Sequence, residues 1–211
     1  MNTKDKIKYK ALSLFSERGF DAVSVRDIAQ AVGIKESSLY NHYKSKKEIF
    51  DCIVKEYANR GSGFFQGMDM LEEGKSFAAD ERTIQMYKNM TPEQFEVISL
   101  QILEYYLTDE INVKFRKMLT IEQYRSPELK ELYRDISFNS SLKFQSQLFA
   151  ALMQEGVLVK TDPYVLALEF FSPIFLIFYK FDSDKDGMAN AKVLLVKHVR
   201  LFNERFGTKL K

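Results

Sequence analysis

The stretch from Ser24 to Lys46, SVRDIAQAVGIKESSLYNHYKSK, constrains the fold and function of this chain more than any other. Ser24 followed by Asp27 is typical of a helix N-terminus, because each side chain can bond the other residue's backbone N–H. From Val25 onward apolar residues recur at i, i+3, i+4 and i+7, which predicts one buried helix face. Gly33 then allows a left-handed turn. The stretch therefore begins with a short, capped amphipathic helix and a tight turn.

The segment after this turn has a different character. Only Leu39 and Tyr43 anchor it to a core, and most of its other side chains are polar. A helix that enters a DNA groove uses such groups on base edges and phosphates. An ordinary surface hairpin of two helices has a similar pattern. Apolar stripes upstream (7–15) and downstream (49–54) predict a three-helix core around the motif, and this context favours a DNA-binding helix-turn-helix.

Residues 4–58 resemble the DNA-binding domain of the TetR (tetracycline-repressor-like) family. The resemblance rests on ALSLFSERGFDAVSVRDIAQAVGI and SSLYNHYKSKKEIF, which occur in unbroken order at the family's spacing. It implies an all-α chain, with a helix-turn-helix domain over 1–58 and a larger helical domain for ligand binding and dimerisation over 59–211. Lys35 stands where the family often has Ser, and Ser37 where it often has Gly. The operator sequence therefore does not follow from the resemblance.

The same resemblance assigns DNA-contacting residues. Polar side chains of the second motif helix would lie in or beside the major groove, and two basic residues outside it would hold the phosphate backbone. Glu36 could accept from a cytosine amino group, and Asn41 could pair with adenine. Tyr40 and His42 would reach phosphates. The predicted DNA-binding residues are Arg26, Glu36, Ser37, Ser38, Tyr40, Asn41, His42 and Lys46.

Charge and composition are compatible with a cytoplasmic DNA-binding protein. Residues 1–58 carry 11 Lys and Arg against 8 Asp and Glu, whereas the whole chain has a net charge of +2. A solvated surface explains so small an excess equally well. The single cysteine, Cys52, excludes an internal disulfide and is typical of a reducing compartment. The most apolar run, 165–178, contains Glu169 and Pro173 and is shorter than the ~20 residues of a membrane span. With no signal-peptide pattern at the N-terminus, we expect a cytoplasmic protein that does not enter the membrane.

Beyond residue 58 the sequence predicts only helices. Thr91-Pro92, Ser126-Pro127 and Asp162-Pro163 are strong helix starts, because the first residue can cap the helix and proline fits its first turn. We expect one long helix from Ser126 to near Gly156 and a last helix over 188–206. The glycine-rich segment at 61–67 predicts a hinge or a disturbed helix end.

The helix over 165–178 is apolar on nearly all sides, so it must be covered on more than one face. The TetR resemblance implies that one face lines a ligand pocket while the other packs with the last helix into a two-fold, four-helix dimer interface. An aromatic, Met-bearing lining suits a hydrophobic or cationic effector. The candidate pocket residues are Met86, Glu104, Tyr105, Tyr106, Met118, Tyr124, Phe144, Phe171 and Phe175. The candidate interface residues are Val193, Leu194, Val196, Val199 and Phe202.

Catalytic and metal chemistry has little support in the sequence. His42 and His198 have no metal-ligand spacing to each other or to Cys52, and no phosphate-binding loop or nucleophile elbow occurs. Residues 182–187 match the opening of a calcium-binding loop, but its twelfth position is Val193 instead of glutamate. We therefore expect no enzyme, no cofactor and no metal, and we interpret 182–187 as an acidic connector.

These observations predict a ligand-responsive transcriptional regulator, with repression as the family's usual polarity. Its partners would be double-stranded palindromic operator DNA, a small-molecule effector and a second copy of the chain. Two other functions stay open. A helical carrier or enzyme for hydrophobic molecules would turn over a bound compound. A ligand-independent DNA-organising protein would bind with little sequence preference and a steep salt dependence.

Overall fold

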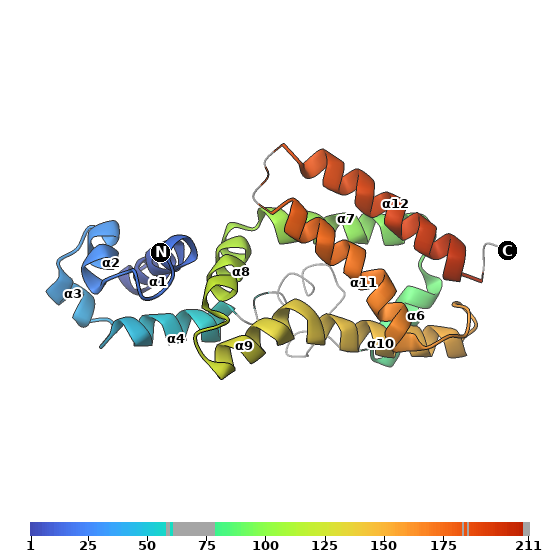
Figure 1. Ribbon diagram of the computed structural model, residues 1–211, viewed down its shortest axis with the longest axis horizontal. Coiled ribbons are helices and arrows are strands. Elements are labelled where there is room, and N and C mark those ends of the chain that lie inside the picture. Colours follow the sequence, from blue (N-terminus) through green and yellow to red (C-terminus); the bar gives the residue numbers. More distant parts are fainter. Residues whose placement is uncertain (58–59, 61–78, 183, 185, 209–211) are drawn as a thin grey trace. The chain divides into compact units, whose positions relative to one another are not determined.

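The computed structural model describes residues 1–208 except 58–59, 61–78, 183 and 185, and its described elements are helices (Figure 1). The predicted all-α class is therefore confirmed. The elements are α1 (Thr3–Arg18), α2 (Val25–Val32), α3 (Glu36–Tyr40), α4 (Lys46–Tyr57), α6 (Glu81–Asn89), α7 (Pro92–Thr108), α8 (Glu110–Glu122), α9 (Pro127–Arg134), the π-helical turn η1 (Asp135–Asn139), α10 (Ser140–Gln154), α11 (Pro163–Lys180) and α12 (Met188–Phe206).

The predicted helix starts are present. Thr91 and Gln94 form a capping box at α7, and the Ser126 hydroxyl accepts from the N–H of Leu129 at the start of α9. Asp162 caps α11, and α12 has the predicted bounds. The long helix expected from Ser126 onward is the succession α9, η1 and α10, in which a π-helical turn replaces regular α-helix between two segments. The predicted hinge at 61–67 lies outside the described residues.

The chain divides into two compact units. The first unit comprises Met1–Gly63 together with Glu110–Asp135, and the second comprises Phe64–Asp109 together with Ile136–Lys211. Helices α8 and α9 thus belong with the N-terminal helices. The domain division expected after residue 58 stays a prediction.

The first unit is built around α1, which packs against α2, α4 and α8. Three phenylalanine rings form the centre of its core: Phe15 lies 5.4 Å from Phe20 and 5.8 Å from Phe50, measured between ring centroids. Tyr57 at the end of α4 contacts Phe115 of α8 edge to face. Edge-to-face rings add to the stability gained by burying their area. These contacts make α8 part of the core that supports α2 and α3.

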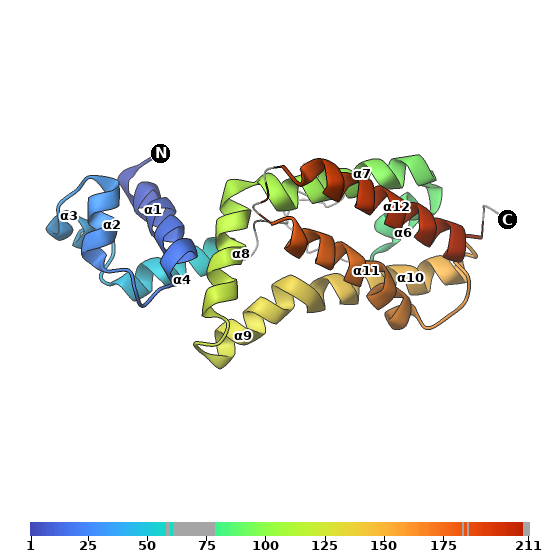
Figure 2. The same ribbon diagram turned by 45° about the horizontal axis from the view of Figure 1, so that its top comes forward.

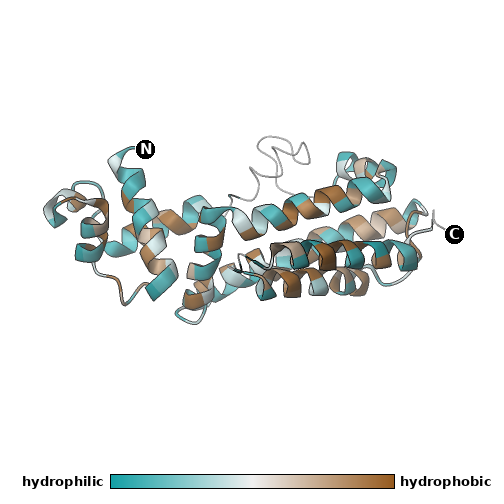
Figure 3. Cartoon of the chain, turned by 90° about the horizontal axis from the view of Figure 1, so that it is seen from above, coloured by the Kyte–Doolittle hydropathy of each residue, from teal (hydrophilic) through white to brown (hydrophobic). Residues whose placement is uncertain are grey.

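The second unit is a helical bundle in which α11 packs against α10, α12 and α7 (Figures 1 and 2). Hydrophobic and hydrophilic residues occur together along these helices (Figure 3), and many of the hydrophobic ones are buried in the core. By length and composition, α11 is the one helix in the described ranges that could cross a membrane. Its Phe170 carbonyl lies 2.8 Å from Nε2 of His198 on α12, and its Glu169 pairs with Arg205. These contacts join α11 to α12 within the bundle.

Candidate DNA-binding surface and ligand pocket

The turn between α2 and α3 has the local geometry that its sequence predicts. The Ser24 hydroxyl accepts from the Asp27 N–H at 3.1 Å, and the Asp27 carboxylate accepts from the Ser24 N–H at 2.7 Å. The bonds from Ser24 hold the pKa of the Asp27 carboxyl below its usual range. Gly33 has φ 80°, and its N–H donates to the carbonyl of Ala29 at 3.0 Å. A residue with a Cβ would be strained in this left-handed conformation. The capping box and the glycine together fix where α2 begins and ends.

Helix α3 is short and is held by its apolar side. Leu39 has no exposed surface and Tyr43 is 1% exposed, so both are anchors as predicted. Most of the polar side chains before and between them face solvent, and Tyr40 is 49% exposed. Among the predicted DNA-binding residues, Ser38 and Lys46 are half-buried, whereas the exposed ones are Arg26, Glu36, Ser37, Tyr40, Asn41 and His42.

Lys46 has a structural role beside its predicted DNA contact. Its ammonium group donates to the carbonyl oxygens of Phe20 and Val23, each at 2.7 Å, and lies 4.2 Å from the centre of the Phe20 ring. These bonds tie the start of α4 to the loop between α1 and α2. The predicted contact of Lys46 with DNA stays a prediction.

A buried carboxylate joins the same loop to α8. Glu122 is 5% exposed, and its Oε1 accepts from the Phe20 N–H at 2.7 Å. Nη1 of Arg125 lies 3.3 Å from Oε2 of Glu122, and Nη2 of Arg125 lies 2.9 Å from Oδ1 of Asp21. The guanidinium carbon of Arg125 lies 4.0 Å from the centre of the Phe20 ring. Gly19, with φ 76°, precedes this contact, and a Cβ there would lie 3.2 Å from the Glu122 oxygen. We call the contact of Phe20 and Asp21 with Glu122 and Arg125 the α8 latch.

The other end of α8 is attached to α1 by polar bonds. The Lys114 ammonium donates to the hydroxyl of Ser13 at 2.8 Å and to the carboxylate of Glu110 at 2.6 Å. The Tyr9 hydroxyl also donates to Glu110 at 2.5 Å. The bonds from Lys114 and Tyr9 lower the pKa of Glu110. Sequence reasoning missed all of these α8 residues, because their partners lie about a hundred positions away along the chain.

The candidate pocket residues chosen from the sequence do not form one cluster. Met118 is fully buried in the first unit, and Tyr124 on the same unit is 84% exposed. In the second unit, Tyr106 stacks on Phe178, and Glu104 pairs with Lys192 at 3.2 Å. Phe144 belongs to the buried core. The half-buried candidates are Met86, Tyr105, Phe171 and Phe175. Their contact with an effector stays a prediction.

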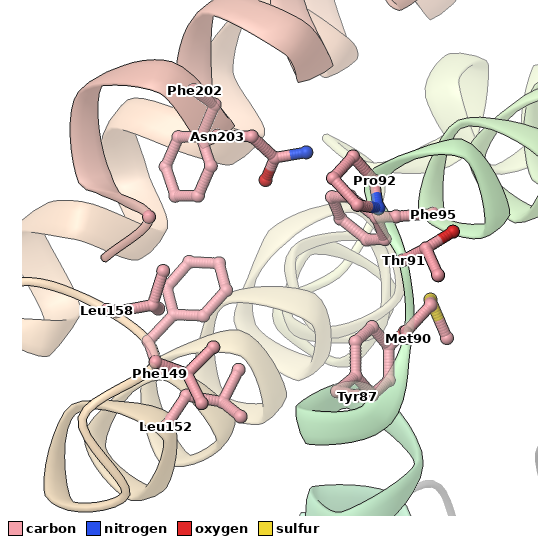
Figure 4. Close-up of a pocket in the computed structure, with 12 residues that line it drawn as sticks. Tyr87, Met90, Thr91, Pro92, Phe95, Phe149, Leu152, Leu158, Phe202 and Asn203 are labelled. Atoms are coloured by element: carbon pink, nitrogen blue, oxygen red, sulfur yellow. The ribbon is translucent and has the colours of Figure 1, made fainter. Parts of the chain in front are cut away.

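A cavity with a volume of ≈ 120 Å³ lies in the second unit, between the end of α6, the start of α7 and the ends of α10 and α12 (Figure 4). A backbone bridge between Leu158 and Gly207 joins two of these ends. The cavity, which we call the end cavity, is lined by Tyr87, Met90, Thr91, Pro92, Phe95, Phe149, Leu152, Val157, Leu158, Phe202, Asn203 and Gly207. Phe202 was predicted at the dimer interface, and none of the predicted pocket residues lines this cavity.

Exposed apolar side chains gather on α11 and α12. Of the fourteen large hydrophobic residues exposed in the described part of the chain, eight lie on these two helices: Tyr164, Val165, Leu168, Leu176, Tyr179, Val193, Leu194 and Leu201. Of the predicted interface residues, Val193 is 53% and Leu194 is 41% exposed, and Val196 is half-buried. Val199 and Phe202 are buried in the cores of the chain itself.

In the acidic segment at 182–187, the Asp184 side chain forms hydrogen bonds with the backbone that follows it. Oδ1 of Asp184 accepts from the N–H groups of Asp186 and Gly187, at 3.1 and 3.0 Å. A Cβ on Gly187 would collide with the Asp184 carboxylate. This geometry agrees with a connector that leads into α12.

Comparisons with known proteins agree with this arrangement. A family model described as "Bacterial regulatory proteins, tetR family" matches residues 9–53. The biofilm operon icaADBC HTH-type negative transcriptional regulator IcaR of Staphylococcus aureus is 34% identical in a match that covers 54% of this chain and 74% of the relative.

Solved structures share the fold. A structure described as a TetR-family transcriptional regulator from Mesorhizobium loti matches with a TM-score of 0.69 and 18% identity, over 98% of this chain and 97% of that one. SmeT of Stenotrophomonas maltophilia, in its complex with triclosan, matches with a TM-score of 0.65 and 14% identity, over 98% and 92% of the two chains.

Proposed function

Because this chain belongs to the tetR family of bacterial regulatory proteins, we propose that it is a dimeric, ligand-responsive repressor of palindromic operator DNA in the cytoplasm. IcaR is a negative transcriptional regulator of a biofilm operon, and this likeness favours repression over activation. SmeT is the repressor of a multidrug efflux pump and forms a complex with triclosan, which supports a small-molecule effector.

The observation that carries the DNA-binding proposal is the exposed polar surface of α3 and of the turn that follows it. Asn41 and His42 are exposed beside the buried anchors Leu39 and Tyr43. The anchors fix the helix, so its polar groups are preorganised to meet a major groove. Asn41 pairs with adenine, as its carboxamide suits the N6 and N7 edge. Tyr40 reaches a phosphate, together with Arg26 and Lys46.

The dimer proposal rests on the exposed apolar sides of α11 and α12. Leu194 and Leu201 are seven positions apart on α12, and Leu168 and Leu176 are eight apart on α11, so each pair lies on one face of its helix. A second copy would cover these faces as a four-helix interface related by a two-fold axis. Val199 and Phe202 take no part in it, because they support the monomer core.

Repression and release follow from the spacing of two recognition helices. A dimer binds when these helices fit successive major grooves, roughly 34–36 Å apart. An effector that binds better to a dimer with another spacing shifts the population away from DNA. A coupling of ~1–3 kcal/mol changes operator affinity about 5–150-fold. The chain's own route for such coupling is α8, which continues from α7 after Asp109 and holds the DNA-binding unit through the α8 latch.

The test is a titration of operator DNA followed by fluorescence anisotropy, with the operator selected from random sequence. Asn41→Ala is expected to weaken binding by about 5–150-fold and to relax preference at one base pair of each half-site, since a bidentate base contact contributes ~1–3 kcal/mol. Asn89→Ala is the matched control, because Asn89 is exposed at the end of α6 in the second unit.

An unchanged operator affinity in Asn41→Ala would contradict the base-reading role. Selection that returns no palindrome, with a steep salt slope on every sequence, would favour the DNA-organising alternative. Chemical conversion of a bound compound would favour the carrier or enzyme alternative.

A further inference from the structure

The end cavity has the size of a molecule with one ring. Its volume is ≈ 120 Å³, and a cavity of about 150 Å³ lined by apolar side chains accepts benzene. Phe149 and Phe202 provide ring surfaces whose centroids lie 5.6 Å apart. Figure 4 shows these rings on one side of the space, with Tyr87, Met90 and Thr91 on the other. Aromatic walls of this kind pack well against a flat ring.

Two polar side chains of the lining make no side-chain hydrogen bond within the part of the chain that the structure describes. Among the described residues, neither the Tyr87 hydroxyl nor the Asn203 carboxamide has a hydrogen-bond partner. Burial raises the pKa of the Tyr87 hydroxyl above its usual range, with no neighbouring bond or charge contributing. The Asn203 carboxamide points toward Pro92 (Figure 4). The Thr91 hydroxyl differs, because it caps α7. Both groups can form a hydrogen bond with a ligand that enters the cavity, the hydroxyl as donor or acceptor and the carboxamide as either.

The lining carries no charge. None of the 12 residues that line the cavity is acidic or basic in this described region. Lys88, which follows Tyr87 in the chain, forms an ion pair with Glu155. A ligand ammonium or carboxylate would lose its hydration without gaining an opposite charge. An uncharged ligand avoids this loss.

From the size, the ring surfaces and the two unpartnered polar groups, we infer that the end cavity binds a small uncharged aromatic molecule with a hydroxyl group, of the size of a simple phenol. The ligand ring lies between Phe149 and the α6–α7 turn, and its hydroxyl bonds Tyr87 or Asn203. This binding is independent of the proposed function. Only its effect on operator affinity rests on that proposal.

Binding is tested with 4-methylphenol on the full chain, with its methionine methyl groups labelled with ¹³C. Met90 lines the end cavity, whereas Met118 is buried in the first unit and Met86 does not line the cavity. The Met90 signal, identified from its loss in Met90→Leu, is expected to shift with ligand concentration, and the Met118 signal is expected to stay in place. A shift of Met86 without Met90 would place the ligand elsewhere and overturn the inference.

The role of the hydroxyl is tested by calorimetry with 4-methylphenol and toluene. One added hydrogen bond corresponds to about a fivefold difference in affinity, so 4-methylphenol is expected to bind at least about fivefold more tightly. Tyr87→Phe keeps the ring and is expected to reduce this preference while toluene affinity is unchanged. Asn203→Leu tests the second polar group in the same way. Tyr164→Phe, at an exposed tyrosine of α11, is the matched control.

Three results would overturn the inference: no binding of either compound, equal affinities for both compounds in the unchanged chain, or tighter binding of benzoate or tetramethylammonium. Operator titration separates this inference from the proposed function. If 4-methylphenol shifts Met90 but leaves operator affinity unchanged, the cavity inference holds and its link to regulation fails. If selection returns no operator at all, the proposed function fails while the binding result stands.

Discussion

The α8 latch is expected to determine how firmly the DNA-binding helices are held. In Glu122→Leu, the Phe20 N–H loses the carboxylate that accepts it at 2.7 Å, and a buried hydrogen bond to a charged group contributes about 1.5–3 kcal/mol. Arg125 loses less, since it is 37% exposed and keeps its ion pair with Asp21. The leucine side chain gains some apolar burial in return. We expect a net loss of about 2 kcal/mol from the free energy of unfolding of the first unit.

One further variant separates the hydrogen bond from the charge, and a second serves as a control. Glu122→Gln keeps an oxygen that can accept from Phe20, so its expected loss is only about 1 kcal/mol. Glu131→Gln is the matched control on α9, because Glu131 is 61% exposed and its partner Arg134 is 3.8 Å away. Exposed ion pairs of this kind contribute about 0–1 kcal/mol to the free energy of unfolding.

The assay is urea unfolding followed by circular dichroism, together with amide hydrogen exchange of Phe20. Exchange is needed because two compact units can unfold in separate transitions. The exchange protection of the Phe20 amide should fall in the order unchanged chain, Glu122→Gln, Glu122→Leu. The reasoning is refuted if Glu122→Leu lies within about 0.5 kcal/mol of the unchanged chain, or if the glutamine and leucine variants are equally destabilised.

Two other predictions concern the anchor of α3 and the dimer. Burial raises the pKa of Tyr43 from its ordinary value of 10 to about 12. The folded state therefore holds the hydroxyl proton more tightly than the unfolded state does. The protonated hydroxyl makes its full contribution to stability below pH 10, and this contribution is lost as the pH rises to 12. The free energy of unfolding should fall by about 2 kcal/mol more over this range in the unchanged chain than in Tyr43→Phe, and equal slopes in the two would disprove the assignment. Leu201→Lys adds a charge to the exposed side of α12 and is expected to convert dimers to monomers in size-exclusion chromatography with light scattering, since a buried unpaired charge is costly. Val97→Lys, at a 54% exposed position of α7, should leave the mass unchanged, and a dimeric Leu201→Lys would count against the proposed interface.

Features that depend on near neighbours along the chain could be predicted from the sequence. The Ser24–Asp27 capping box, the left-handed Gly33 and the bounds of α12 all involve residues within a few positions of one another. The same holds for the anchors of α3, because an apolar pair four positions apart on a polar helix has one way to be buried.

Features that depend on distant partners could not be predicted in this way. Glu122 and Phe20 are 102 positions apart, and nothing in the helical pattern of α8 records which unit it joins. The end cavity was missed because it is formed where the ends of several helices meet, and the sequence does not record which helix ends lie together. Periodicity also places Val199 and Phe202 on an apolar face of their helix, and both are buried in the chain's own core. The apolar pattern alone does not tell whether such a face packs inside the chain or against a partner.

The discontinuous make-up of the first unit has a consequence for anyone who exchanges DNA specificity between such regulators. A graft that transfers only residues 1–58 would take Phe20 away from Glu122, and Tyr57 away from the Phe115 ring 6.2 Å distant. The α8 helix of the host regulator would then pack against side chains that do not match its own. A chimera that also carries Glu110–Asp135 moves both halves of the unit together. Swapping DNA recognition here requires two transplanted segments, and the second, Glu110–Asp135, lies in the middle of the sequence.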